Sequence, residues 1–166
     1  MINAHSHITT TVYDARSSVL AVQDPLGKFV SYTYDPAMNK ILRIDSRNWP
    51  TTYSFDALNR QSGYIYNSGQ RATFTYNHLS LQTGMADWTG LTTMTYDSDE
   101  RPAGIAYPTG KAVTYSYDPN GNELSRWQVN AAGTALAAYT ATYDPARNRL
   151  TWWNSGMITT DYYLCI

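Results

Sequence analysis

Five aspartates recur at the same place in a repeated string of residues, and carboxylates often serve as general acids and bases. They are Asp35, Asp56, Asp97, Asp118 and Asp144, and each follows an aromatic residue. An enzyme needs one site where several groups converge, but these five occupy equivalent positions in successive copies. Short side chains of this type cap the backbone N–H groups of turns. We therefore predict that these aspartates are turn caps and not catalytic residues.

The sequence contains no closely spaced group of other residue types that catalyse reactions or bind metals. His5 and His7 alternate along a short stretch, but no third ligand lies nearby and His78 is distant. Ser, His and Asp occur without a nucleophile elbow or the spacing of a triad. Cys165 is the only cysteine, so the single chain can form neither a disulfide nor a cysteine-based metal site. We expect no catalytic residue, no metal site and no cofactor, and predict that the protein is not an enzyme.

The five tryptophans are the strongest candidates for contact with a ligand, because exposed aromatic rings can stack on sugar rings and mark binding surfaces. Trp49 and Trp88 lie in or beside predicted turns, so they are the candidate ligand-stacking residues. Trp127, Trp152 and Trp153 fall in predicted strands. We expect these three to fill the packed face of a sheet.

All of these residues are positioned by an internal repeat of about 21 residues. Its anchors are aromatic residues at spacings of 21, 21, 21, 20, 21 and 26: Tyr13, Tyr34, Phe55, Tyr76, Tyr96, Tyr117 and Tyr143. Six anchors are followed directly by aspartate: Asp14, Asp35, Asp56, Asp97, Asp118 and Asp144. A second marker, a turn-forming residue, follows each anchor by 13 to 16 residues: Gly27, Asn48, Gly69, Gly90, Gly110, Gly133 and Gly156. Two unrelated markers in one register indicate a true repeat.

Each repeat is predicted to be a β-hairpin, because aromatic and hydroxyl residues alternate with period 2 before Tyr34, Phe55 and Tyr117, and looser copies precede Tyr76, Tyr96 and Tyr143. The aromatic side chains would face the packed side, and Thr or Ser would face the other side. About seven units would give about 14 short strands, and a sheet of that size curls as its twist accumulates. We therefore predict an all-β fold in which antiparallel hairpin repeats form a curled, spiralling meander sheet. The array would span residues 13–163 as one domain, between flanks at 1–12 and 164–166.

The sixth repeat is longer than the others because of an Ala-rich stretch at residues 130–138. We predict a longer hairpin loop or extended strand tips there, with an Ala-rich helical turn as the alternative.

Composition limits the classes of partner. Fifteen tyrosines against three phenylalanines suit broad, half-buried sheet faces, because the tyrosine ring packs and its hydroxyl seeks a polar partner. A net charge of −1 provides no basic surface, so nucleic acid is not an expected partner. No apolar run approaches the ~20 residues of a membrane span, and the N-terminus lacks the features of a signal peptide. The length of 166 residues leaves room for a sizeable core.

The Tyr-Asp anchors and Gly turns resemble the RHS, or YD, repeat family. The closest copies are the segments 34–41, 117–124 and 143–150, together with the turn at 24–27, and the resemblance covers about residues 13–163. It implies a spiralling β-strip that closes into a hollow shell, as in bacterial polymorphic toxins, insecticidal toxin complexes and teneurins. In the toxins, that shell encloses a cytotoxic C-terminal domain. The resemblance thus makes this chain an open segment of an RHS-type β-shell.

The chain departs from the family pattern in two ways. The glycine of the Tyr-Asp turn is kept only as Gly121, and the matching positions hold Ser17, Met38, Asn59, Ser80, Glu100 and Arg147. If the turn needs a left-handed residue, Met38, Glu100 and Arg147 each cost about 1 kcal/mol, and otherwise the turns adopt another type. The family's Pro- and Asp-rich self-cleavage segment and its variable toxin domain are also missing.

Taken together, these features predict a non-enzymatic structural module that encloses or displays a toxin or effector domain. Its partners would be further repeats of the same array or the encapsulated effector domain. The alternative is a β-repeat module that binds carbohydrate or another cell-surface partner, and a third reading is a hydrolase or self-cleaving fragment. The resemblance implies a location outside the cell, secreted or at the cell surface, as part of a larger protein.

Overall fold

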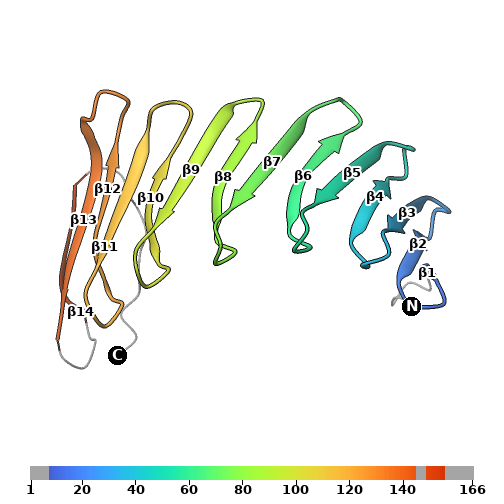
Figure 1. Cartoon of the computed structure of the whole chain (residues 1–166), viewed down its shortest axis with the longest axis horizontal. Coiled ribbons are helices and arrows are strands. Elements are labelled where there is room, and N and C mark those ends of the chain that lie inside the picture. Colours follow the sequence, from blue (N-terminus) through green and yellow to red (C-terminus); the bar gives the residue numbers. More distant parts are fainter. Residues whose placement is uncertain (1–7, 145–148, 156–166) are drawn as a thin grey trace. The chain divides into compact units, whose positions relative to one another are not determined.

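The computed structural model describes residues 8–144 and 149–155, and for 149–155 only the backbone. The described residues form fourteen β-strands (Figure 1). In chain order the strands are β1 (Thr10–Tyr13), β2 (Val19–Gln23), β3 (Phe29–Tyr34), β4 (Lys40–Ile44), β5 (Pro50–Phe55), β6 (Gln61–Tyr66), β7 (Arg71–Tyr76), β8 (Gln82–Asp87), β9 (Gly90–Tyr96), β10 (Pro102–Ala106), β11 (Ala112–Tyr117), β12 (Glu123–Val129), β13 (Ala135–Tyr143) and β14 (Arg149–Ser155). Within the described ranges there is no helix of the length and apolarity that crossing a membrane requires.

The chain divides into two compact units. The N-terminal unit holds Met1–Thr75 and Ala86–Trp88, and the C-terminal unit holds Tyr76–Met85 and Thr89–Ile166. In the N-terminal unit each strand from β1 to β7 pairs antiparallel with the next. In the C-terminal unit the same holds from β9 to β14. The predicted all-β fold of antiparallel hairpins is confirmed.

Eleven turns share one geometry, whether they follow an anchor or contain the second marker. After β11, for example, the N–H of Asp118 bonds the carbonyl of Asn122 at 2.9 Å, and the N–H of Gly121 bonds the carbonyl of Asp118 at 3.0 Å. The register shifts between Ser116 and Tyr117, just before this turn. This is the type I turn with a glycine-type bulge that commonly closes three-residue hairpin loops. The same type of turn therefore connects the strands at both ends of the sheet.

The fourth residue of these turns has a positive φ even where it is not glycine. Met38 has a φ of 71° and Glu100 a φ of 64°, close to the 86° of Gly121. The turn type is therefore kept, and the strain falls on the substituted side chains. Position 147 lies outside the described residues.

We expect Glu100→Gly to raise the free energy of unfolding by about 1 kcal/mol, because a left-handed conformation costs about 1–2 kcal/mol for a residue with a Cβ. Urea denaturation measures the change. Gly121→Glu is the matched reverse substitution in the same kind of turn and should lose a similar amount. A Glu100→Gly protein no more stable than the parent would show that the turn carries no such strain.

The stretched sixth repeat contains extended strands and no helical turn. β12 and β13 are long, and the turn between them has the common geometry, with the N–H of Gly133 bonding the carbonyl of Asn130 at 2.9 Å. Of the two shapes predicted for this stretch, extended strand tips are correct.

The two faces of each hairpin differ as the alternation predicts. We call the side of the anchors the aromatic face and the opposite side the hydroxyl face. In the pairing of β5 with β6, Tyr53 lies opposite Tyr64 on the aromatic face, and Ser54 lies opposite Gly63 on the hydroxyl face. The residues just before the anchors are exposed: Thr33, Ser54, Thr75, Thr95, Ser116 and Thr142.

The described residues of the two units do not form the sizeable core that the chain length permits. The buried apolar residues among those described are all alanines, Ala72, Ala137, Ala138 and Ala141, and no large side chain there is fully buried. Within each unit, strand contacts join only strands that are neighbours in the sequence. Stability must therefore come from pairing and packing between adjacent hairpins, as in repeat proteins whose units contact only their neighbours.

Candidate binding surfaces

The recurring aspartates cap the turns that follow the anchors. Oδ1 of Asp118 accepts the N–H groups of Asn120 and Asn122, both at 2.9 Å. The same pair of bonds, to the second and fourth residues beyond, is made by Asp14, Asp24, Asp45, Asp56, Asn77, Asp97 and Asn130. Asp24, Asp45 and Asn130 lie at the opposite strand ends, three residues before the markers Gly27, Asn48 and Gly133. These side chains therefore accept hydrogen bonds from backbone N–H groups and stabilise the turns.

The second carboxylate oxygen of several caps is also bonded, and this lowers the pKa. A side-chain hydrogen bond from Arg47 holds the pKa of Asp45 at about 2, helped by the N–H of Trp49. Side-chain bonds from Asn39 to Asp35 and from Arg60 to Asp56 likewise lower the pKa of each carboxyl group. Such groups are ionised at neutral pH and make poor proton donors.

We expect acid to destabilise the protein as these caps lose their charge. Because the pKa values are lower in the folded than in the unfolded chain, where they are about 4, the caps stabilise the fold above pH 4. That contribution is lost as the pH falls through the folded values, towards about 2 for Asp45. Thermal melting at pH 7, 4, 3 and 2 measures the loss. Asp45→Asn keeps the acceptor oxygen and should weaken the pH dependence, whereas equal melting temperatures at pH 7 and 2 would contradict the account.

Asp144, the last of the predicted caps, is half-buried, and the loop after it, residues 145–148, lies outside the described residues. His5, His7 and Gly156 also lie outside them. In the described part of the chain, no three His, Cys, Asp or Glu side chains are placed to hold a metal ion.

The anchor tyrosines connect the two strands of each repeat through their hydroxyl groups. The Tyr117 hydroxyl donates to the carbonyl of Pro102 at 2.9 Å, and Tyr96 donates to Gln82 at 2.8 Å. Tyr34 and Tyr143 make the same bond to Val19 and Glu123, each at 3.0 Å. In every case the acceptor is the first residue of the strand that follows the preceding anchor. The preference for Tyr over Phe at the anchors was the sequence signal for this bond.

One strand tryptophan differs from its predicted position, and one turn tryptophan is partly covered. Trp127 was expected on the packed face, but it pairs with Thr114 and Ala138 on the hydroxyl face and is 42% exposed. Trp49 has the Arg47 guanidinium 4.0 Å from its ring centre, and Arg47 is held in turn by Asp45 at 2.8 Å. One face of the Trp49 ring is therefore already covered. The side chains of Trp152 and Trp153 are outside the described part.

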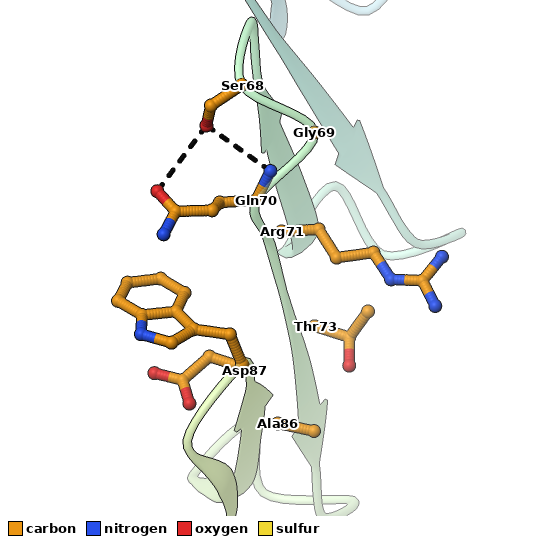
Figure 2. Close-up of a pocket in the computed structure, with 8 residues that line it drawn as sticks. Ser68, Gly69, Gln70, Arg71, Thr73, Ala86 and Asp87 are labelled. Atoms are coloured by element: carbon orange, nitrogen blue, oxygen red, sulfur yellow. Dashed lines mark hydrogen bonds between the residues drawn. The ribbon is translucent and has the colours of Figure 1, made fainter.

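Trp88 lies beside a recess of about 650 Å³ in the N-terminal unit. Residues of the β6–β7 turn and of β7 line it together with Ala86, Asp87 and Trp88. Figure 2 shows Gln70 and Asp87 on one side of β7 and Arg71 and Thr73 on the other. The Trp88 side chain is 61% exposed. An exposed ring beside amide, hydroxyl and carboxylate groups can both stack on a ligand and bond it.

A second recess, of about 880 Å³, lies on the aromatic face of the C-terminal unit. Met94, Ile105, Val113 and Tyr115 give it an apolar floor. Lys111 and Arg126 are its basic side chains, and Arg126 is paired with Glu123 at 3.0 Å. This surface can pack against another apolar surface.

Comparison with known proteins supports the fold. No protein-family model matches the sequence. No curated protein matches it either. Among solved structures, TcdB2–TccC3 without its hypervariable C-terminal region aligns with 84% of the chain at 16% identity and a TM-score of 0.64. TcdB2–TccC3–Cdc42 aligns with 82% at 15% identity and a TM-score of 0.61. The Photorhabdus luminescens Tc holotoxin pore aligns with 81% at 16% identity and a TM-score of 0.59.

These likenesses concern the fold alone, because the identities are low. The chain spans about a tenth of each of the three solved chains.

Proposed function

We propose that this chain is a wall segment of an RHS-type repeat shell, a structural and non-enzymatic module that encloses or displays another domain. One observation carries the proposal. The hairpins form a repeating sheet without a buried core in the described residues, and the same fold occurs as a small part of much longer toxin-complex chains. Its partners would be further repeats of the array and the enclosed effector domain.

The physical character of the array suits a wall. Each strand is stabilised by its neighbours through turns, strand pairing and tyrosine hydroxyls, so the sheet can extend by adding units without needing a core. In the N-terminal unit, for instance, Asn39 Nδ2 of one turn donates to Asn59 Oδ1 of the next at 2.9 Å. A location outside the cell, as part of a larger secreted or surface protein, fits this role.

A lack of enzymatic activity is part of the proposal, and the state of the acidic groups supports it. The recurring carboxylates are ionised and hold backbone N–H groups, as Asp118 does for Asn120 and Asn122. Self-cleavage is the activity most relevant to the resemblance. Incubating the purified protein and measuring its intact mass tests it, because a single unchanged mass is expected and a discrete pair of fragments would contradict the proposal.

Protease protection tests the enclosing role. The chain would be produced together with the coding sequence that flanks it, and treated with a nonspecific protease. The neighbouring domain should resist digestion while the array is folded. It should be digested when the array carries a substitution that disrupts strand packing. Equal digestion in both cases would contradict a shell.

Carbohydrate binding is the second candidate function, and Trp88 is the observation that favours it. Its side chain is largely exposed and borders a recess with polar groups. Such binding would be compatible with a shell whose outer turns contact a cell surface.

A further inference from the structure

We infer that the recess beside Trp88 binds a neutral sugar unit, which stacks on the indole ring and bonds through its hydroxyl groups to Asp87 and Gln70. The inference rests on carbohydrate binding, the second candidate function above, and does not depend on whether the array encloses a domain.

The Trp88 ring is exposed to solvent. Within the described part of the chain, no guanidinium group or second ring covers it, and 61% of the side chain is exposed. Trp88 and Thr89 alone separate β8 from β9, in place of the longer common turn. A large apolar ring held in a short turn, beside a recess, is suited to contact with a ligand.

Polar groups line the same recess as Trp88. Gln70 and Asp87 lie on one side of β7 (Figure 2), and the hydroxyl of Ser68 lies 3.4 Å from Gln70 Oε1. That contact leaves the amide NH2 of Gln70 as a donor. The Asp87 carboxylate has several lone pairs, so it can accept ligand hydroxyl groups beside its existing contacts. Donors and acceptors that share one recess with an exposed ring match a sugar, which offers C–H faces and hydroxyl edges.

The volume of the recess and the charges that line it limit the kind of ligand. A recess of about 650 Å³ lies within the usual range for small-ligand sites and holds one or two sugar rings. The carboxylate of Asp87 beside the ring disfavours a second negative charge, whereas it strengthens bonds from neutral hydroxyl groups. Arg71 also lines the recess, but from the opposite side of β7 (Figure 2). On the side of Gln70 and Asp87, a neutral sugar is therefore favoured over an acidic one.

Trp49 supplies an internal comparison in the same unit. Its side chain is 49% exposed and also lies in a turn, but Arg47 covers one face of the ring at 4.0 Å. It is absent from the lining of the Trp88 recess. We therefore expect Trp49 to make no contribution to sugar binding.

The test uses the full chain and tryptophan fluorescence or calorimetry. The neutral probes are maltotriose, cellotriose, N-acetylchitotriose and a galactose disaccharide, and the anionic probes are sialyllactose and inorganic phosphate. At least one neutral probe should bind, and Trp88→Ala should weaken it at least about tenfold. Trp49→Ala should leave its affinity within about twofold of the parent. Asp87→Asn, which removes the charge and keeps an acceptor, should weaken binding less than Trp88→Ala does.

Three results would overturn the inference. One is that no neutral probe binds at 10 mM. Another is that binding survives Trp88→Ala in a protein whose circular dichroism and melting match the parent. The last is that only sialyllactose or phosphate binds and that Arg71→Ala abolishes this. None of these bears on protease protection, so failure here is distinguishable from failure of the shell proposal.

Discussion

Gly63→Val is expected to lower the free energy of unfolding by about 3 kcal/mol, near the upper end of what overpacking a closely packed site usually costs. A Cβ at Gly63 would lie 2.7 Å from the carbonyl oxygen of Ala72 and 3.2 Å from Ser54 Oγ. Strand pairing holds the strands on both sides in place, because Gly63 lies opposite Ser54 in β5 and opposite Thr73, the residue after Ala72, in β7. The backbone must move to admit any side chain. Urea denaturation of the full chain measures the loss.

Gly69→Ala is the control for this substitution. Nothing lies within 4 Å of a Cβ built at Gly69, but its φ is +82°, so only conformational strain of about 1 kcal/mol is expected. If Gly63→Val were no more destabilising than Gly69→Ala, the strands around Gly63 would not be packed as closely as described.

Tyr117→Ala is expected to cost about 2–3 kcal/mol, the sum of a half-buried ring and a hydrogen bond. The hydroxyl donates to Pro102 at 2.9 Å, and the Arg101 guanidinium lies 4.7 Å from the ring centre. Tyr117→Phe removes only the hydroxyl and should cost about 1 kcal/mol. The difference between the two variants separates packing from hydrogen bonding in the anchor.

Phe55 provides the reverse experiment. It is the one anchor without a hydroxyl, and Lys40, the first residue of β4, occupies the place of the acceptor. Phe55→Tyr should therefore gain about 1 kcal/mol. If Tyr117→Phe and Phe55→Tyr both left stability unchanged, the hydroxyl bonds would contribute nothing to the connection between the strands.

The features predicted correctly from the sequence are those that depend on local signals. The alternation before Tyr34 and Tyr117 specifies a strand within six residues, and the Asp after each anchor marks the turn. Repetition then fixes the hairpin order, because each strand pairs with its neighbour in the sequence. The sequence did not predict whether Met38 and Glu100 adopt the left-handed conformation. The turn requires that conformation, but a residue with a Cβ disfavours it.

Features that depend on register were not predicted. Trp127 was assigned to the packed face, but its pairing with Thr114 places it on the hydroxyl face. A shift of one residue reverses the face of every side chain in a strand, and the bulge before Tyr117 makes such a shift. The bond from Tyr117 to Pro102 was also missed, because it joins residues 15 positions apart on the adjacent strands β10 and β11.

The candidate site was predicted only in part. Trp49 and Trp88 were equivalent as turn tryptophans, and the sequence shows Arg47 two residues before Trp49 without showing that it covers the ring. The recess beside Trp88 combines the β6–β7 turn with the end of β8. That juxtaposition depends on folding and has no sequence marker of its own.

Electron cryomicroscopy of the natural protein, with the sequence that flanks this chain in its gene, tests the central proposal most directly. The account predicts that residues 13–163 form part of a curved wall of β-hairpins around density for another domain. A compact particle in which these hairpins pack face to face around a closed core, with no enclosed density, would contradict it.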